Sequence, residues 1–323
     1  MKKLTLLIAI VIINLNAFSQ DISEVKRDML VKALYSNDSI RYNNTKHNVF
    51  KFEEYKEADF FKVVITQKEI LDCTELVNST SEIHINEENQ LVFTGKLIDR
   101  FNKQSNDIIS VDLIENKLFK TSGEQLELKK FYDVNCGYGE ISFKAPIKSN
   151  YSANESISGF LKFELNYLIG YDKIELTLKD IGKTIILNKC QYKIINIKGN
   201  GIVLDKICEF ENELKVINFN NKGEVAKPYS QMKVMEMAKN DSTIALGSFN
   251  TNNRKTYKMV YDLFEKRPTI TFKEFKEIFT SQKLMEMKEY GQYIIIENIA
   301  PFENKFILYS PVYQTEIIKV VMK

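Results

Sequence analysis

The clearest strand pattern in the chain is LKFELNY, residues 161–167. Apolar and polar side chains alternate along it without a break, which is the period of a strand with one buried and one solvated face. The same period recurs at residues 83–85, 109–113 and 174–178. One wet and one buried face are typical of antiparallel sandwiches and barrels. We therefore predict a mainly β protein, α+β by content, built from antiparallel sandwich-like or barrel-like modules.

A hairpin with a cysteine at each end is predicted around the turn signal KGNG, residues 198–201. β-like runs lie on both sides of this turn, and Cys190 and Cys208 flank them. In a hairpin closed here the two cysteines lie opposite each other or one residue out of register, so a bridge can form if the register cooperates. We predict a disulfide between Cys190 and Cys208. Cys73 and Cys136 are then either a second pair or two buried thiols.

Two short helices are predicted from capping-box spacings. The first follows residues 21–24, carries Val25, Met29 and Leu30 at helical intervals, and ends near residues 36–38. The second follows residues 66–69. Three of its side chains share one face at helical spacing, namely Ile70, Cys73 and Val77.

The strongest helix signal in the chain lies near residues 272–290. Thr271 and Glu274 have the spacing of a capping box, and Gly291 supplies a stop. Ile270 and Phe275 occupy the two positions of a hydrophobic staple. Residues 280–281 can divide this segment into two helices.

The chain has 323 residues, which exceeds the size at which one hydrophobic core usually keeps growing. We therefore expect two or three domains. Glycine and proline are scarce, which argues against long low-complexity linkers. The predicted division is a signal peptide at 1–19, an N-terminal α+β domain at 20–150, a small β module at 151–210 and a C-terminal α+β domain at 211–323.

The amino terminus has the organisation of a signal peptide. Lysines at positions 2 and 3 precede an uninterrupted apolar stretch over residues 4–13, which is too short for a comfortable membrane-spanning helix. Small residues at Ala17 and Ser19 occupy the positions that signal peptidase reads. We expect cleavage near Ser19–Gln20 and a periplasmic or secreted product, with an uncleaved anchor as the alternative. The first cysteine is Cys73, so no lipid-bearing cysteine stands at the cleavage point and a lipoprotein is not expected.

Charge argues against nucleic acid as a partner. Residues 1–19 contain two lysines and no acidic residue, so the remaining chain carries equal numbers of basic and acidic side chains. Lysine and glutamate are finely mixed along it, whereas nucleic-acid binding needs clustered cations. We expect the partner to be an envelope or extracellular protein or a glycan, with no nucleic acid and no transmembrane segment after signal removal.

Catalytic and metal-binding signatures are largely missing from the sequence. Only two histidines occur, His47 and His84, so a multi-histidine metal site is not expected, and His84 is predicted to face solvent. Residues 182–184, GKT, resemble the end of a phosphate-binding loop, but the first glycine of that loop is absent and we interpret them as a turn. Residues 133–140 depart from a calcium loop and are interpreted as a glycine-bearing turn. We predict no cofactor, no metal and no catalytic residue.

One aromatic group could bind sugars by stacking. Phe302, Tyr309 and Tyr313 lie close together near the carboxy terminus, and they form either a surface platform or part of the sheet core.

The function that we favour is an exported, non-catalytic binding protein of a bacterial envelope. The alternative is a secreted hydrolase that uses carboxylates on polysaccharide or peptide, because carboxylate pairs are set by separation in space and leave no mark along the chain. An inhibitor or chaperone-like accessory is a third reading. A cleft with converging carboxylates of raised pKa would favour the enzyme, and a flat or edge-strand surface would favour binding.

Overall fold

The computed structural model describes residues 24–43, 47–62, 64–101, 108–129, 132–148, 156–209, 212–245 and 252–322. Antiparallel sheets dominate these residues, and this confirms the predicted mainly β class. The predicted signal peptide lies outside the described residues. None of the described helices combines the length and the apolar character that crossing a bilayer requires.

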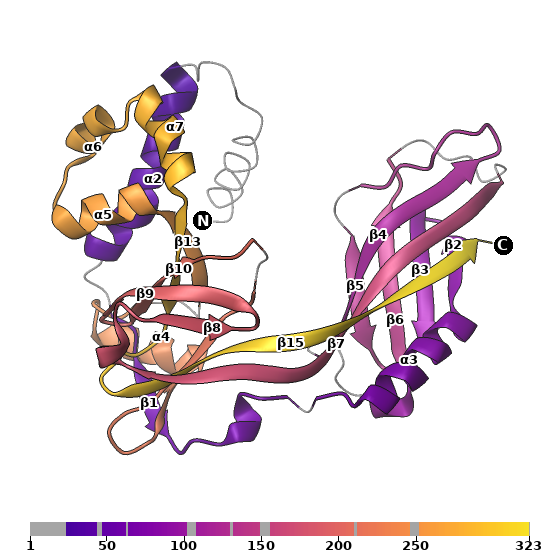
Figure 1. Ribbon diagram of the computed structural model, residues 1–323, viewed down its shortest axis with the longest axis horizontal. Coiled ribbons are helices and arrows are strands. Elements are labelled where there is room, and N and C mark those ends of the chain that lie inside the picture. Colours follow the sequence, from indigo (N-terminus) through magenta and orange to yellow (C-terminus); the bar gives the residue numbers. More distant parts are fainter. Residues whose placement is uncertain are drawn as a thin grey trace. The chain divides into compact units, whose positions relative to one another are not determined.

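The chain folds into two compact units, each built from segments far apart in sequence. Unit 1 comprises Met1–Tyr55 and Lys173–Tyr309, and unit 2 comprises Lys56–Asp172 and Ser310–Lys323. Two long strands, β7 (Ile157–Thr177) and β15 (Lys305–Met322), contribute residues to both units (Figure 1). The division into contiguous modules at residues 150 and 210 stays a prediction.

Unit 2 is a two-layer β-sandwich. In one layer β7 lies between β15 and β4. The other layer has the order β2-β3-β6-β5 (Figure 1). The new strands are β4 (Ile109–Lys120), β2 (Glu82–Ile85), β3 (Gln90–Lys96), β6 (Glu140–Pro146) and β5 (Asp133–Gly137).

The facing sides of the two layers form the core of unit 2. All four apolar side chains of LKFELNY are fully buried there, as their alternation predicts. Phe163 stacks on Phe93 of the opposite layer with ring centroids 4.3 Å apart, and it meets Phe143 edge-on at 5.3 Å. The sequence period therefore selects the side chains that join the layers.

Helix α3 (Gln67–Thr80) packs on this sandwich as its sequence predicts. The Thr66 side chain accepts a hydrogen bond from the Glu69 amide, while the Glu69 carboxylate accepts one from the Thr66 amide. The expected face is buried, and it consists of Ile70, Cys73 and Val77. Short 3₁₀ turns precede and follow the helix at Glu57–Asp59 and Asp99–Phe101.

Unit 1 contains a five-stranded antiparallel sheet of order β13-β14-β10-β9-β8. Its strands are β13 (Asn252–Tyr257), β14 (Gln292–Glu297), β10 (Gly201–Lys206), β9 (Cys190–Lys198) and β8 (Thr184–Leu187). One face of the sheet packs on Leu176, Phe306 and Leu308, which come from the unit 1 ends of β7 and β15. The 3₁₀ turn Leu178–Asp180 links β7 to β8.

The predicted Cys190–Cys208 disulfide is confirmed, and a β-bulge explains its register. Gly201 pairs with Lys198 at the turn, and unbroken pairing from there would place Gln191 opposite Cys208. The register shifts by one residue between Val203 and Leu204, because β9 carries one extra residue there. The shifted pairing brings the cysteines opposite each other with their Cα atoms 5.5 Å apart, a normal separation for a bridge.

Four helices form a second core in unit 1 (Figure 1). They are α2 (Glu24–Asn43), α5 (Lys258–Lys266), α6 (Phe272–Ile278) and α7 (Ser281–Tyr290). The expected end of α2 near residues 36–38 is wrong, because the helix continues to Asn43. Its expected face is also partly wrong. Leu30 and Val31 are buried, whereas Val25 and Met29 are 71% and 47% exposed.

The segment predicted as a helix near 272–290 is two helices. The Thr271–Glu274 capping box is present, and Ile270 and Phe275 are both buried. Thr280 caps α7 through the Lys283 amide, which confirms the predicted division. Gly291 follows α7 with φ 80°, a conformation that favours glycine.

Smaller elements complete unit 1. β11 pairs with the first residues of β15, and β1 pairs with β12 to form a two-stranded sheet. Helix α4 follows β12. Their bounds are β11 (Lys215–Asn218), β1 (Phe50–Glu53), β12 (Val225–Pro228) and α4 (Gln231–Asn240).

Candidate functional site

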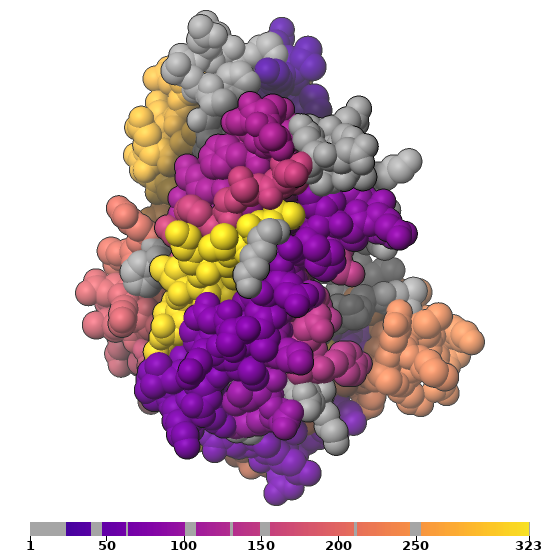
Figure 2. Space-filling model, turned by 90° about the vertical axis from the view of Figure 1, so that its right-hand side faces the viewer, coloured from indigo at the N-terminus to yellow at the C-terminus, as the bar shows by residue number. Residues whose placement is uncertain are grey.

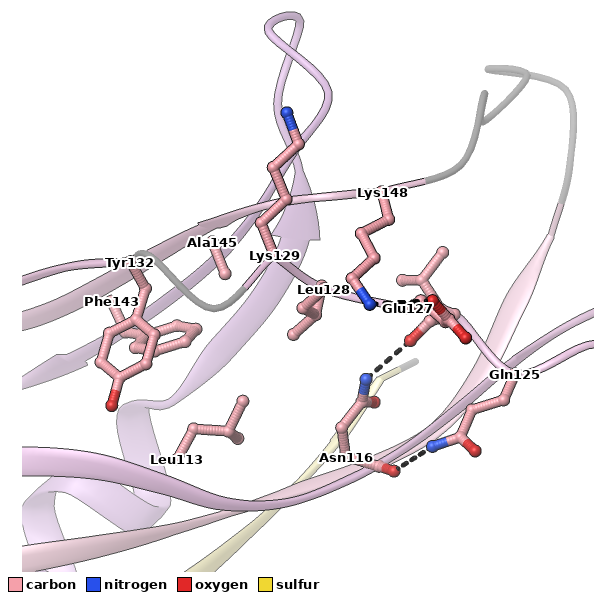
Figure 3. Close-up of a pocket in the computed structure, with 11 residues that line it drawn as sticks. Leu113, Asn116, Gln125, Glu127, Leu128, Lys129, Tyr132, Phe143, Ala145 and Lys148 are labelled. Carbon is pink, nitrogen blue, oxygen red and sulfur yellow. Dashed lines mark hydrogen bonds and ion pairs between the residues drawn. The ribbon is translucent and has the colours of Figure 1, made fainter. Parts of the chain in front are cut away.

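A cleft of about 360 Å³ opens in unit 2, at the side of the sandwich where the edge strands β4 and β5 are neighbours (Figure 3). The segment 125–129 crosses between the two layers at this side. Its start pairs with β4, where Gln125 bridges Phe119, and its end pairs with the continuation of β6, where Leu128 bridges Ile147. The cleft therefore lies at the β4–β5 edge of the sandwich, beside the segment 125–129 that joins the two layers.

Side-chain hydrogen bonds between β4 and the crossing segment hold that segment in place. The side-chain amide of Asn116 donates a hydrogen bond to the backbone carbonyl of Leu126 at 2.7 Å, and the side-chain amide of Gln125 donates one to the backbone carbonyl of Asn116 at 2.6 Å. At the other layer the Lys129 amide donates to the Pro146 carbonyl at 2.8 Å. These bonds hold both ends of the segment, so the cleft wall is anchored before any ligand arrives.

The floor of the cleft is apolar and continuous with the core. Phe143 and Ala145 of β6 are fully buried, and Leu113 and Leu128 are half-buried beside them. Tyr132 lies against Phe143 with ring centroids 4.9 Å apart and is 40% exposed (Figure 3). A ligand that fills the cleft would therefore cover apolar surface next to the sandwich interior.

The rim of the cleft is polar and has an excess of positive charge. Lys148 and Glu127 form an ion pair at 3.1 Å, and both side chains are more than half exposed. Lys129 is exposed on the same rim, and no carboxylate of the described residues forms an ion pair with it. Figure 3 shows its ammonium directed away from the Lys148–Glu127 pair. One cation of the rim is thus available for an anionic group.

The cleft is poorly equipped for hydrolysis by paired carboxylates. Glu127 is the one carboxylate among its described lining residues, and it already neutralises Lys148. A glycosidase-type mechanism needs two carboxyl groups facing the scissile bond. No group of histidine, cysteine and carboxylate side chains in the described part of the chain could hold a metal ion.

Among the described residues, a carboxyl group with a raised pKa lies outside the cleft, in unit 1. Partial burial raises the pKa of Asp262 on α5, and burial together with Asp262 and Asp205 raises the pKa of Tyr293 to about 12. Lys258 forms an ion pair with Asp205 at 2.7 Å and lies over the Tyr293 ring at 5.3 Å. Two carboxylates therefore flank one buried phenol, which is the described arrangement closest to an acid–base site.

The predicted aromatic group is divided between the units. Phe302 and Tyr309 belong to unit 1 and are buried, with Phe302 packed against Phe306 at 4.8 Å. Tyr313 belongs to unit 2 and is 42% exposed. None of the three lines the cleft. Two rings of the group thus offer no face to solvent.

Other sequence motifs have simple structural roles. His84 is exposed, as predicted. Residues 133–140 form the hairpin of β5 and β6, with Tyr138 and Gly139 at its turn, and Gly182 lies in the turn before β8. The first segment is therefore mostly strand with a turn confined to residues 138–139, and the second is a turn, as interpreted.

Sequence reasoning did not find the cleft. Its floor and rim come from β4, from the segment 125–129 and from β6. Alternating leucines at 126 and 128 are the one local signal, and that pattern also fits an ordinary strand.

Comparison with protein-family models, with curated proteins and with solved structures gives no match for this chain. Its function is therefore inferred from the geometry of the cleft and its surroundings.

Proposed function

We propose that the protein is a non-catalytic binding protein, and that its site is the cleft in unit 2. The ligand is an extended segment of a partner protein that carries an apolar side chain next to a carboxylate. The observation that carries this proposal is the combination of an apolar floor with Lys129 on the rim, which forms no ion pair with a carboxylate of the described residues. An apolar group on the floor gains from burial, and a carboxylate gains from a charge-assisted contact with Lys129.

The size and position of the cleft support a peptide ligand. A volume of about 360 Å³ lies within the range of ligand sites. β5 is at the edge of its sheet, whereas the edge of β4 near Leu118 already pairs with the crossing segment. Edge strands carry backbone groups that can pair with an added strand, so the partner segment would gain main-chain hydrogen bonds beside the cleft.

The location that we propose is the periplasm or the extracellular medium. The Cys190–Cys208 disulfide supports an oxidising compartment, because structural disulfides persist there and are rare in the cytosol. The signal-peptide pattern of residues 1–19 supports the same route. The partner would then be an envelope or secreted protein.

A peptide-binding titration tests the proposal. A library of short peptides ending in an apolar residue with a free carboxylate is screened against the purified protein, and the best binder is compared with its carboxyamide. We expect the carboxyamide to bind about tenfold more weakly, because it lacks the charge that Lys129 attracts.

Two variants sharpen this test. Lys129→Glu should weaken binding of the free acid by at least about tenfold. Lys144→Glu is the matched control, since Lys144 is exposed on β6 and alternates with Phe143, which places it on the outer face of the same layer. Equal losses in the two variants, or equal binding of acid and amide, would refute the proposed site.

The second candidate function is hydrolysis by Asp262 and Asp205, the two carboxyl groups of unit 1 that act on Tyr293. The observation that favours it is the raised pKa of Asp262 beside Tyr293. The decisive screen measures turnover of envelope glycans and of peptides by the protein and by its Asp262→Asn variant. Turnover that disappears in Asp262→Asn would support the hydrolase, and on the binding proposal no turnover is expected from either protein.

A further inference from the structure

The outer face of the β4-β7-β15 layer carries a cationic and apolar patch within unit 2. Lys117 of β4 pairs in register with Phe160 of β7, so their side chains share a face. On the other side of Phe160, the Lys319 ammonium of β15 lies 4.0 Å from the centroid of the Phe160 ring. Lys162, two residues along β7, lies 5.7 Å from the same ring. Three lysines therefore surround one aromatic side chain.

The patch has a net positive charge. Glu115 is its single acidic side chain, and it forms an ion pair with Lys162, its register partner. The hydrogen bond from Lys162 and then the charges of Lys117 and Lys319 lower the pKa of Glu115. All three ammonium groups thus act on one carboxylate, and two positive charges remain in excess.

Aliphatic side chains border the lysines on the same face. Ile317 and Val321 alternate with Lys319 along β15 and are 60% and 57% exposed. Phe119 alternates with Lys117 along β4 and is 37% exposed. Figure 2 shows β15, drawn in yellow, at the surface of unit 2. A group of large exposed apolar side chains next to lysines is a candidate interaction surface.

The opposite end of this face has the reverse charge. Asp112 and Glu164 are direct register partners there, and both are acidic. Polar Asn166 and Thr315 adjoin them, with the Thr315 hydroxyl donating to the Asn166 side chain at 2.7 Å. The positive and apolar character is therefore confined to the end of the face that carries Lys117 and Lys319.

We propose that this patch docks on the surface of a bilayer that contains anionic phospholipids. The lysines contact the headgroup phosphates, while Ile317, Val321 and Phe119 enter the apolar boundary beneath them. A polar polyanion would also satisfy the lysines, but it would leave the three apolar side chains in contact with water. A bilayer interface satisfies both requirements at once.

Vesicle co-sedimentation with the full chain tests this inference. The probes are vesicles of phosphatidylcholine alone and vesicles with about one third phosphatidylglycerol. We expect binding to be at least about tenfold stronger to the anionic vesicles and to fall as salt is added. Equal binding to both vesicles, or to neither, would overturn the proposal.

Three variants locate the binding on the patch. Lys117→Gln with Lys162→Gln and Lys319→Gln should abolish the preference for anionic vesicles. The matched control removes three exposed lysines elsewhere in unit 2, by Lys68→Gln, Lys96→Gln and Lys144→Gln, and should keep the preference. Ile317→Ser with Val321→Ser should reduce the binding that remains at high salt.

Two outcomes would overturn the proposal. Unchanged vesicle binding in the triple lysine variant would assign membrane affinity to another part of the chain. Binding of polyglutamate as strong as that of vesicles would assign the patch to acidic proteins. Thermal unfolding of each variant verifies that it is folded.

Discussion

Unit 1 and unit 2 each contain two cysteines, and the two pairs have opposite chemistry. Cys190 and Cys208 of unit 1 flank the two adjacent strands of one hairpin and are bonded. Cys73 of α3 and Cys136 of β5 both lie in the core of unit 2 and remain thiols. The register of the hairpin brings Cys190 and Cys208 opposite each other so that they can bond. The packing of α3 on the sandwich instead buries Cys73 and Cys136 as thiols. The comparison of the two units can be tested at Gly159 and Gly182, at the two pairs of cysteines, and at the capping box of α3.

The largest expected effect concerns a close approach of two strands in unit 2. Gly159 of β7 has φ 126°, and a Cβ atom there would lie 1.9 Å from the Lys117 carbonyl oxygen. Gly159→Ala should therefore destabilise the protein by about 3 kcal/mol or more. Gly182 of unit 1 is the matched control, because its φ is 87° but nothing lies within 4 Å of the position that a Cβ atom would take. Gly182→Ala should cost only about 1 kcal/mol in a denaturant titration, and equal losses would contradict the account.

The second effect concerns the hairpin of unit 1. Replacing both Cys190 and Cys208 by Ala opens a loop with a sequence separation of 18 residues. We expect a loss of about 3 kcal/mol, since the bridge restricts the unfolded chain. The measurement is chemical unfolding of the double variant against the unreduced protein. A change below about 0.5 kcal/mol would contradict the expected restriction of the unfolded chain by the bridge.

Thiol reactivity separates the two pairs of cysteines directly. Burial, and then the neighbouring Cys73, raises the pKa of Cys136 to about 12, and burial raises the pKa of Cys73. Both groups are therefore uncharged and shielded at neutral pH. A thiol reagent should label neither in the folded protein, both after unfolding, and all four cysteines only after reduction. Labelling of the folded protein would show that the core of unit 2 opens.

The smallest effect is a pH dependence at the start of α3. The Thr66 amide, and then the Arg100 guanidinium, lower the pKa of Glu69 from 4.5 to about 2. A carboxyl group with a lowered folded-state pKa stabilises the fold above its unfolded value and loses that contribution as pH falls. The free energy of unfolding should fall as the pH is lowered from 4.5 to 2, and this fall should be smaller in Glu69→Gln than in the native protein. The difference should be less than about 1 kcal/mol, because the Arg100–Glu69 ion pair is partly solvated. Glu87→Gln, in an exposed turn, is the control and should leave this loss unchanged.

Local patterns in the sequence predicted much of the fold. The alternation of LKFELNY selected the buried side chains of β7, and the capping boxes located the starts of α3 and α6. The end of α2 differs from the prediction, because its last turns lack an apolar period and the Asp38 carboxylate accepts hydrogen bonds from the distant residues Arg254 and Thr256. Contacts of this kind join residues more than two hundred positions apart and leave no local pattern.

The candidate site could not be predicted, for the same physical reason. Leu113, Leu128 and Phe143 share the cleft only because β4, the crossing segment and β6 meet at the open edge of the sandwich. The cysteine pairing shows the intermediate case. The sequence located the hairpin, but the bulge between Val203 and Leu204 decided which residue stands opposite Cys208. Register and edge geometry are properties of the assembled sheets.

Hydrogen exchange of the protein with and without its best-binding peptide tests the central claim most directly. We expect the peptide to slow exchange of backbone amides in the segment 125–129 and in β5, which line and adjoin the cleft of unit 2. The hairpin of β9 and β10 in unit 1 should be unaffected. Protection confined to unit 1, or unchanged exchange at residues 125–137 under saturating peptide, would contradict a peptide site in the cleft.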